Sequence, residues 1–523
     1  MEVAQVLIAG EWREANYKTT FYAQNPATGE TLTRAFPVSE WADCDAMLEA
    51  ANAAAQQLRS VPPERIAAFL EAYARNIESS SAQIIETAHE ETALPITPRL
   101  KDGELPRTVG QLRQAAAAAR EGSWARATLD LARNIRSCFE PIGPVVVFGP
   151  NNFPLAFNGI SGGDFAAAIA AGNPVIAKAH PLHPETSRLF AEDARKAVAE
   201  VGLPPATIQM IFHLANEDGL KLVADRRVAA VGFTGSRAAG LHLKKAAEAA
   251  GKPIYLEMSS INPVILLPGA LAERPAEIAQ ELADSCLTVA GQVCTCPNLI
   301  LLLRGAPADA LVDQVAQAFQ DRAAQPLLSS SGLTQLHAGV KSLVEAGASL
   351  LTGGEVVPGD GYRHENTMLK ATASQVLAAD GALEREVFGN VTTVVTAETL
   401  EELRQTVGRL EGSLTGSIYS AKSGADDPMY DTIASALREK VGRMLNDKMP
   451  TGVAVSPAMN HGGPYPATGH PGFTAVGIPT AMVRFAALRC YDGVRQERLP
   501  NILKDKITNP STWRSIDGEW VRG

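Results

Sequence analysis

Gly143-Pro-Val-Val-Val-Phe-Gly149 is a short apolar run bounded by glycines, and after a helix-length segment at 162–171 comes a second such run, Pro174-Val-Ile-Ala-Lys178. Strands that are apolar on both faces, with a helix between them, are typical of a parallel sheet covered on both sides. The alternation continues through helices at 186–201 and 308–322 and through strands at 208–212, 229–234, 253–257, 298–303 and 390–396. The sequence therefore predicts an α/β protein with two parallel-sheet lobes that meet near residues 259–262.

The length and composition are those of an ordinary globular protein. The chain has 523 residues, of which 46% are hydrophobic and 20% charged, and its formal net charge is −10. This length corresponds to about two or three domains, and the acidic balance argues against nucleic acid as a partner. Six scattered cysteines do not make a disulfide framework, so we expect a cytoplasmic protein. No segment suits a signal peptide or a membrane span, and no membrane partner is expected.

The two ends of the chain carry similar short segments. Val6-Leu-Ile-Ala-Gly-Glu-Trp-Arg13 and Ser515-Ile-Asp-Gly-Glu-Trp-Val-Arg522 each predict a strand, a glycine-centred turn and a second strand. Because only two copies occur, we interpret them as separate edge hairpins and not as a repeat architecture. Residues 37–122 are rich in helical patterns.

A candidate nucleophile lies in Gly291-Gln-Val-Cys294-Thr-Cys296-Pro297. A thiol on a turn between glycine and proline can face backbone amides, which lower a thiol pKa and favour the reactive thiolate. The alternative is that Cys294 only packs as a small apolar side chain, the usual role of a free cysteine. The Cys-x-Cys spacing has no further ligands at a recognisable distance, so no metal site is predicted.

Two polar residues end predicted strands of the first lobe. Glu257 closes Ile254-Tyr-Leu-Glu257, and Asn152 follows the strand that ends at Phe148. The carboxyl ends of parallel strands meet at one edge of a sheet, where ligands bind. There Glu257 can act as a base and the Asn152 amide can donate to an oxyanion. The alternatives are a solvated strand-end glutamate and an ordinary turn asparagine.

The signal for a dinucleotide is unusual, because no Gly-x-Gly-x-x-Gly follows the first strand of the sheet. Instead, Phe233-Thr-Gly235-Ser236-Arg-Ala-Ala-Gly240 comes directly after a buried strand and opens a helix. Backbone amides at such a helix start can hold a pyrophosphate. Lys178, at the end of another strand, can reach a ribose or a phosphate, or can be an ordinary strand-end lysine.

Taken in order, these motifs resemble the aldehyde dehydrogenase superfamily. The resemblance is carried by Asn152-Phe-Pro, Lys178, Phe233-Thr-Gly-Ser, Leu256-Glu257, Gly291-Gln-x-Cys294-Thr and Glu386-Val-Phe-Gly. Further motifs resemble the α-ketoglutaric semialdehyde (2,5-dioxovalerate) dehydrogenase subgroup: Asn152-Phe-Pro-Leu-Ala-Phe, Lys178-Ala-His-Pro-x-His-Pro, Pro450-Thr-Gly-Val-Ala-Val and His461-Gly-Gly-Pro-Tyr-Pro-Ala-Thr. Three places depart from the usual family pattern: Met258-Ser-Ser, Pro297-Asn298 and Gly389-Asn390.

The resemblance implies an aldehyde dehydrogenase fold with two Rossmann-like lobes and a small β element. It implies an NAD(P)-binding domain at 1–123 and 141–258, a catalytic domain at 259–465, and an oligomerisation element at 124–140 and 480–523. That element would make the protein a homodimer or homotetramer. The alternative for the segment from Trp124 to Glu140 is a plain surface hairpin.

The resemblance also implies roles for single residues. Cys294 would attack the aldehyde carbon to give a thioester, Asn152 would stabilise the oxyanion, and Glu257 would activate the hydrolytic water. The nicotinamide part of the cofactor would be held by Glu386 and Phe388. The other cofactor-binding residues implied are Lys178, His180, Gly235, Ser236 and Gly240.

The cofactor and substrate expectations follow from the same comparison. Many NAD-preferring members carry a glutamate three residues after the ribose-binding lysine, where this chain has Pro181, so we expect NADP to be used at least as well as NAD. The expected reaction is oxidation of α-ketoglutaric semialdehyde to 2-oxoglutarate. The alternatives are an NADP-linked dehydrogenase for fatty or aromatic aldehydes and a non-catalytic nucleotide-binding paralogue.

Overall fold

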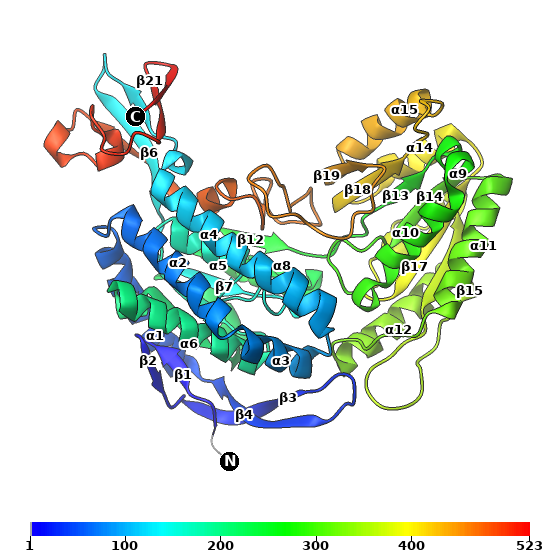
Figure 1. The fold of residues 1–523 in the computed structure, drawn as a ribbon, viewed down its shortest axis with the longest axis horizontal. Helices are drawn as coiled ribbons and strands as arrows, with labels where there is room; N and C mark the ends of the chain where they lie inside the picture. The colour runs from blue at the N-terminus through cyan, green and yellow to red at the C-terminus, as the bar shows by residue number, and fades with distance from the viewer. Residues whose placement is uncertain (1–2) are drawn as a thin grey trace.

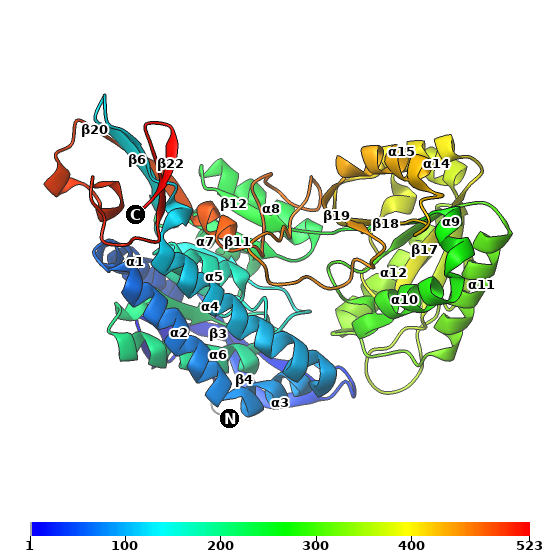
Figure 2. The same cartoon turned by 45° about the horizontal axis from the view of Figure 1, so that its top comes forward.

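The computed structural model describes residues 3–523 and confirms the α/β architecture with two parallel-sheet lobes. The lobes lie side by side, and an arm of β structure projects from the first of them (Figure 1). The same arrangement is visible after a turn about the horizontal axis (Figure 2). Among residues 3–523, no helix combines the length and the apolar character needed to cross a bilayer.

The sheet of the first lobe has seven strands in the order β12-β11-β7-β8-β9-β1-β2. Strands β12 to β9 are parallel, and the N-terminal hairpin β1–β2 adds to β9 in antiparallel fashion. The strand bounds are β1 (Val6–Ile8), β2 (Glu11–Arg13), β7 (Val145–Phe148), β8 (Val175–Lys178), β9 (Ile208–Ile211), β11 (Ala230–Thr234) and β12 (Ile254–Glu257). Most residues of β7, β8 and β9 are buried, which explains their continuous apolar sequence.

Helices cover this sheet in two groups. In the first group, α5 packs against β7 and β8, α2 and α4 pack against α5, and α6 packs against α2. The second group consists of α7 and α8, which pack against each other. Every residue of α5 is buried, and its alanines permit the close approach of neighbouring helices. The helices of this lobe are α1 (Trp41–Leu58), α2 (Pro63–Ser79), α3 (Ser81–Thr92), the π-helical η1 (Ile96–Glu104), α4 (Leu105–Glu121), α5 (Gly163–Ala170), α6 (Pro184–Val201), η3 (Pro205–Thr207), α7 (Asn216–Ala224) and α8 (Arg237–Ala249).

The second lobe is built on a sheet in the order β15-β16-β17-β14-β13-β18-β19, in which only the edge strand β15 is antiparallel. Its strands are β13 (Val264–Leu266), β14 (Leu299–Leu303), β15 (Ser349–Thr352), β16 (Thr367–Thr372), β17 (Val391–Ala397), β18 (Ser413–Tyr419) and β19 (Val441–Asn446). Successive residues of β14 enter different apolar clusters: Leu299 and Leu301 join one, and Ile300 and Leu302 the other. The sheet is therefore buried on both faces.

The helices of the second lobe divide between these two clusters. Residues of α10 and α11 belong to the cluster with Ile300, and residues of α12 to α15 belong to the cluster with Leu299. The bounds are α9 (Pro268–Glu273), α10 (Pro275–Leu287), η4 (Thr288–Gly291), α11 (Ala306–Asp321), α12 (Ser330–Glu345), α13 (Ala373–Ala378), η5 (Ala382–Glu384), α14 (Leu400–Arg409) and α15 (Asp427–Arg438).

The projecting arm is a five-stranded sheet in the order β20-β6-β5-β21-β22. It combines β5 (Thr128–Asp130) and β6 (Ile135–Pro141) with β20 (Ala486–Asp492), β21 (Trp513–Ile516) and β22 (Glu519–Arg522). Short helical turns complete this region: η2 (Ser123–Ala125), η6 (Thr480–Phe485), η7 (Gln496–Arg498) and η8 (Asn501–Leu503). The β character predicted for residues 124–140 and 480–523 is confirmed. Both end hairpins occupy sheet edges as expected.

One small sheet has no counterpart in the sequence prediction. It joins β3 (Tyr17–Gln24), β4 (Thr31–Ser39) and β10 (His213–Leu214). Strand β3 is mostly exposed, so it lacks the regular alternation of buried and exposed residues that identifies a strand in a sequence.

Candidate active site

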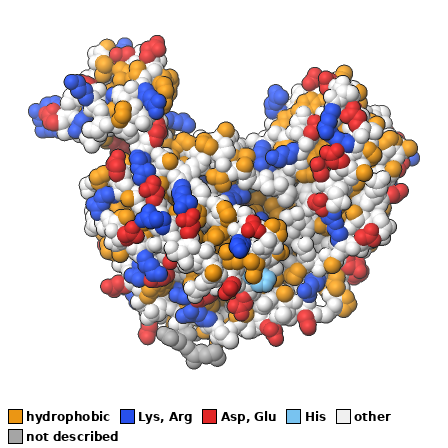
Figure 3. Space-filling view, viewed as in Figure 1, with side chains coloured by type: hydrophobic (Ala, Val, Ile, Leu, Met, Phe, Trp, Pro, Cys, Tyr) orange, Lys and Arg blue, Asp and Glu red, His pale blue; other side chains and the backbone are white. Residues whose placement is uncertain are grey.

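The carboxyl edge of the first sheet collects the polar residues that the sequence placed at strand ends. Asn152 follows β7, Lys178 closes β8, Ser236 follows β11, and Glu257 closes β12. Parallel pairing of these strands brings their ends to one side of the sheet. In the space-filling view, the molecule is hollowed between the two lobes, with hydrophobic and basic side chains around the hollow (Figure 3).

The segment that carries Cys294 enters from the second lobe through a strained turn. Val289, Ala290 and Gly291 all have positive φ, at 54°, 50° and 67°. Non-glycine residues rarely adopt this conformation, and it persists where the surrounding structure imposes it. A Cβ at Gly291 would lie 2.0 Å from the Gly389 carbonyl oxygen. The turn therefore packs directly on the chain that follows Glu386.

Asn262 fastens the nucleophile segment from the other side. Its side-chain amide donates to the carbonyl oxygens of Cys294 and Cys296, both at 2.9 Å, and of Ser260 at 3.1 Å. Asn262 itself has a φ of 48°, which asparagine tolerates better than most residues. The sequence analysis placed Asn262 only at the lobe boundary and gave it no role.

His461 is the largest addition to the predicted site. Its Nε2 atom lies 3.4 Å from the Cys294 sulfur and 3.0 Å from Glu257 Oε1. The side chains of His461 and Glu257 are almost completely buried, so this contact forms away from bulk water. The sequence analysis quoted His461 within a motif but assigned it no function, because 167 and 204 positions separate it from its two partners.

The electrostatic setting of Cys294 corrects one expectation. Burial, followed by the nearby Glu257 carboxylate, raises the pKa of the Cys294 thiol well above its usual range, although the Arg107 charge acts in the opposite direction. We expected backbone amides on a turn to lower this pKa. The thiol is therefore neutral at rest and must lose a proton before it can act as a nucleophile.

Asn152 lies beside the same segment. Its side-chain amide donates to the Gln292 backbone carbonyl oxygen at 3.0 Å. The backbone carbonyl oxygen of Asn152 accepts from Arg99 Nη2 at 3.1 Å. Arg99 forms an ion pair with the buried Glu104 at 2.8 Å. The side-chain amide of Asn152 is therefore held at Gln292, which precedes Cys294 by two positions.

Glu386 and Phe388 lie on the segment against which Gly291 packs. Burial raises the pKa of the Glu386 carboxyl to about 7, although hydrogen bonds from Ser259 and from the Ser260 backbone oppose this change. The Phe388 side chain is 36% exposed.

The predicted cofactor residues form a separate group at the sheet edge. The Ser236 hydroxyl accepts from the Ala239 N–H at 3.3 Å and caps α8, and Gly235 precedes it. A Cβ at Gly240 would lie 3.2 Å from Met258. His180 stacks on His183 with ring centroids 5.4 Å apart. Burial lowers the pKa of Lys178 to about 8, and no carboxylate of residues 3–523 offsets this effect.

Glu257, Cys294 and His461 also form a group of three donor atoms that lie within 4.8 Å of one another. The sequence predicted no metal site, because these residues have no ligand spacing along the chain. A structural zinc usually takes four ligands. Here three are present, and the imidazole nitrogen already contacts both partners. We interpret the group as one that moves protons.

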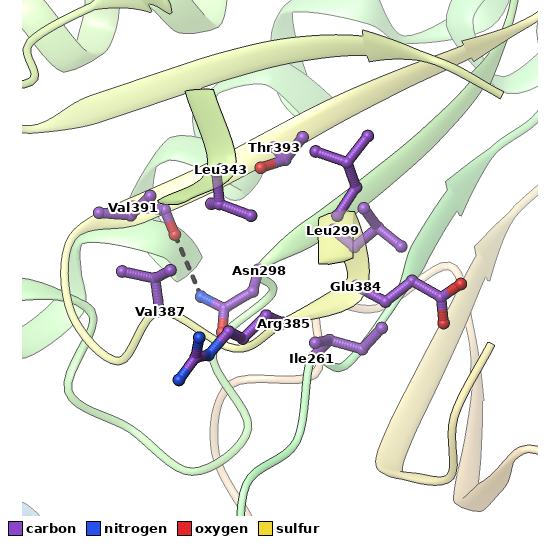
Figure 4. A pocket seen from close by; sticks show the side chains of 10 residues that line it. Ile261, Asn298, Leu299, Leu343, Glu384, Arg385, Val387, Val391 and Thr393 are labelled. Atoms are coloured by element: carbon purple, nitrogen blue, oxygen red, sulfur yellow. Dashed lines mark hydrogen bonds between the residues drawn. The ribbon is translucent and has the colours of Figure 1, made fainter. Parts of the chain in front are cut away.

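A small pocket in the second lobe lies apart from these side chains. It is lined by Ile261, Asn298, Leu343, Val387 and Val391 among others, and the Asn298 side chain donates to the Val391 carbonyl oxygen at 3.1 Å (Figure 4). None of the residues predicted to be catalytic lines it. It therefore belongs to the packing beneath the Glu386 segment.

The fold is that of aldehyde dehydrogenases, and within it a thiol, an imidazole and a carboxylate meet in one cluster. Residues 12–444 match the Aldehyde dehydrogenase family, and the chain belongs to this family.

Relatives and solved structures agree with this assignment. The chain is 38% identical over 524 residues to alpha-ketoglutaric semialdehyde dehydrogenase 2 of Azospirillum brasilense, with 98% of each chain covered. It is 36% identical to an alpha-ketoglutaric semialdehyde dehydrogenase of Acinetobacter baylyi, covering 88% of this chain and 89% of the other. The fold matches an NAD+ complex of aldehyde dehydrogenase from Bacillus cereus with a TM-score of 0.80 at 20% identity, covering 94% of this chain and 96% of the other.

We expect Asn262→Ala to displace Cys294 and to lower kcat/KM at least tenfold. The substitution removes two donations to the nucleophile segment, each worth about 1 kcal/mol, and about 1.4 kcal/mol of lost transition-state binding is tenfold in rate. Steady-state kinetics and the rate of iodoacetamide alkylation of Cys294 test this expectation.

The matched control is Asn134→Ala, because Asn134 has a similar φ of 53° but lies in the arm. Kinetics and alkylation of Asn262→Ala within twofold of the wild type would show that Asn262 does not position the nucleophile.

Proposed function

We propose that the protein oxidises an aldehyde to a carboxylate with NAD(P)+ through a thioester on Cys294, and that the substrate is α-ketoglutaric semialdehyde. The observation that carries the reaction type is the contact of His461 Nε2 with both the Cys294 sulfur and the Glu257 carboxylate. The substrate rests on the two relatives with 38% and 36% identity, both named for this activity.

The first step is the activation of the thiol. In the neutral imidazole that carries its proton on Nδ1, His461 Nε2 accepts the proton that leaves the Cys294 sulfur, and the resulting Nε2–H donates to Glu257 Oε1. The sulfur then bonds to the aldehyde carbon, and the carbonyl electron pair moves onto the oxygen. The side-chain amide of Asn152 and the backbone N–H of Cys294 donate to this oxyanion.

The residues at the sheet edge fit a dinucleotide. Ser236 caps α8, whose N-terminal amides suit a pyrophosphate, and Lys178 is a half-buried cation whose pKa no carboxylate of residues 3–523 raises. A bound nicotinamide would supply the hydride acceptor for the oxidation. Gly235, Gly240, His180, Glu386 and Phe388 complete the proposed cofactor contacts.

The second half of the reaction is hydrolysis of the thioester. Glu257 takes a proton from a water molecule, the resulting hydroxide attacks the thioester carbon, and the carbon–sulfur bond breaks to return the thiolate. One oxygen of Glu257, Oε2, has no hydrogen-bond partner among residues 3–523. This oxygen is therefore available to the water while Oε1 holds His461.

We also propose the division of labour among the parts of the fold. Residues 1–123 and 141–258 form the cofactor-binding domain, 259–465 the catalytic domain, and 124–140 with 480–523 the oligomerisation element. The arm exposes large apolar side chains, among them Leu488, Trp513 and Trp520, which a second copy of the chain would cover. A homodimer or homotetramer in the cytoplasm is the corresponding assembly.

A panel of aldehydes tests the proposed substrate. We expect kcat/KM for α-ketoglutaric semialdehyde to exceed that for pentanal and benzaldehyde at least tenfold with NADP. Equal or higher values for the neutral aldehydes would favour a dehydrogenase of fatty or aromatic aldehydes. No turnover of any aldehyde with either cofactor would identify a non-catalytic paralogue.

Two substitutions separate the two halves of the reaction. Cys294→Ala removes the nucleophile and should abolish oxidation, whereas Glu257→Gln should still release one equivalent of NAD(P)H in a burst before turnover stalls. Stopped-flow absorbance of NAD(P)H measures both.

Cys490→Ala is the control, because Cys490 is exposed on the arm. If Cys294→Ala turned over normally, the nucleophile would be another residue, and Cys296 would be the next to test.

The cofactor preference should depend on pH through Lys178. At pH 7 we expect NADP to be used at least as well as NAD, because Pro181 carries no charge to repel a 2′-phosphate. Burial lowers the pKa of Lys178 to about 8, so its positive charge is present below this pH and is lost as the pH rises through it. The ratio of kcat/KM for NADP to that for NAD should therefore fall between pH 7 and 9.5.

Lys178→Arg is the matched variant, because an arginine stays charged throughout this range. Its ratio should remain flat across the same pH values. A wild-type preference for NAD of more than tenfold at pH 7 would contradict the inference from Pro181.

A further inference from the structure

Arg107 lies close to the reacting thiol without any role in the proposed mechanism. It is the third residue of α4, and its guanidinium carbon lies 4.8 Å from the centre of the Phe157 ring and 5.7 Å from that of Phe153. The Phe157 ring lies in turn 5.8 Å from the His461 ring, which contacts Cys294. One aromatic ring therefore separates the Arg107 guanidinium from the catalytic cluster.

Two nitrogens of the Arg107 guanidinium donate no hydrogen bond to the described residues of the folded chain. Its Nε and Nη2 atoms are buried, and neither has a hydrogen-bond partner among residues 3–523. Two other arginines of this region also have an Nε without a partner among these residues, but their terminal nitrogens are paired. Arg99 pairs with Glu104 at 2.8 Å, and Arg443 donates to the carbonyl oxygens of Pro450 and Gly452 at 2.7 and 3.0 Å.

An unpaired buried cation is costly. The effective penalty for taking an ion out of water is several kcal/mol, and it is repaid only by an opposite charge or by hydrogen bonds. Burial lowers the pKa of Arg107, although the Cys294 sulfur when it is ionised, and the Glu104 and Glu257 carboxylates, act in the opposite direction. Stacking on Phe157 recovers part of this penalty. The remaining donors need an acceptor that the described residues do not supply.

We propose that Arg107 binds the carboxylate at the far end of an aldehyde substrate. A guanidinium presents two parallel N–H donors that match the two oxygens of a carboxylate. Phe157 contacts both this cation and the His461 ring, and Phe153 packs on Phe157 with ring centroids 5.2 Å apart, so the carbon chain of the substrate would lie against apolar rings. This inference rests on the proposed function and names the side chain that selects acidic aldehydes.

Selectivity follows from the same arrangement. An aldehyde with a distal carboxylate satisfies the buried donors, whereas a neutral aldehyde of equal length leaves them unpaired. A site built to hydrogen-bond one group discriminates strongly against an analogue that lacks it.

The test compares the wild type with Arg107→Met and Arg107→Lys on α-ketoglutaric semialdehyde and on pentanal. We expect Arg107→Met to lower kcat/KM for the acidic aldehyde at least 100-fold, mainly through KM, and to lower that for pentanal less than fivefold. Arg107→Lys keeps the positive charge but lacks the two parallel N–H donors, so its kcat/KM for the acidic aldehyde should fall about tenfold.

Arg113→Met is the matched control on the same helix. Arg113 lies on α4 but pairs with the exposed Glu78 at 2.7 Å, and its side chain is half exposed. This variant should match the wild type on both substrates.

A second measurement needs no turnover. Glutarate or 2-oxoglutarate, bound through a carboxylate at Arg107, should slow iodoacetamide alkylation of Cys294 in the wild type and in Arg113→Met, and should not slow it in Arg107→Met. If Arg107→Met fails to fold, as judged by circular dichroism, the same comparison is made with Arg107→Lys, whose protection should be weakened.

The outcomes separate this inference from the proposed function. An equal fall of kcat/KM for both substrates in Arg107→Met would show that Arg107 serves the thiol. An unchanged kcat/KM for the acidic aldehyde would place the carboxylate elsewhere, at Arg443 for example. Either result overturns the inference. If wild-type enzyme instead preferred pentanal, the proposed substrate would fail, whereas the protection experiment would still report whether Arg107 binds a carboxylate.

Discussion

The contact of one imidazole nitrogen with a sulfur and a carboxylate is the constraint on which the site depends. Cys294, Glu257 and His461 come from three distant parts of the chain, and their donor atoms lie within 4.8 Å of one another. Such a cluster exists only if the first sheet, the second lobe and the return segment after β19 are all in place. The strained turn at 289–291 and the two donations of Asn262 to Cys294 and Cys296 serve this one alignment.

The same cluster explains why the site can rest without reacting. A thiol whose pKa is raised by burial and by a carboxylate remains protonated, and is therefore protected from oxidation, which attacks the thiolate. Of the two carboxyls near the sulfur, Glu257 is buried and Glu386 is half-buried.

The sequence was sufficient for most of the architecture, because buried parallel strands have an unmistakable apolar pattern. It also supplied Cys294, Glu257 and Asn152, since each lies at a strand end or on a turn of recognisable type. The roles proposed for His461, Asn262 and Arg107 could not be read from the sequence for a physical reason. His461 and Asn262 contact residues 204 and 32 positions away, and Arg107 is marked by donors that have no partner among residues 3–523, and neither feature shows in local spacing. The exposed strand β3 escaped because nothing buries one of its faces.

The arm has a consequence for how the chain is made. Strands β5 and β6 lie in the middle of the five-stranded sheet, but their outer neighbours β20 and β21 belong to the C-terminal end. A ribosome adds about 5–20 residues per second, so the β5–β6 hairpin waits for tens of seconds with both edges open. Unpaired strand edges invite pairing with other chains. The last forty residues therefore supply the strands that pair with both edges of a hairpin synthesised long before them. A nascent chain that ends before these residues leaves both edges of that hairpin unpaired.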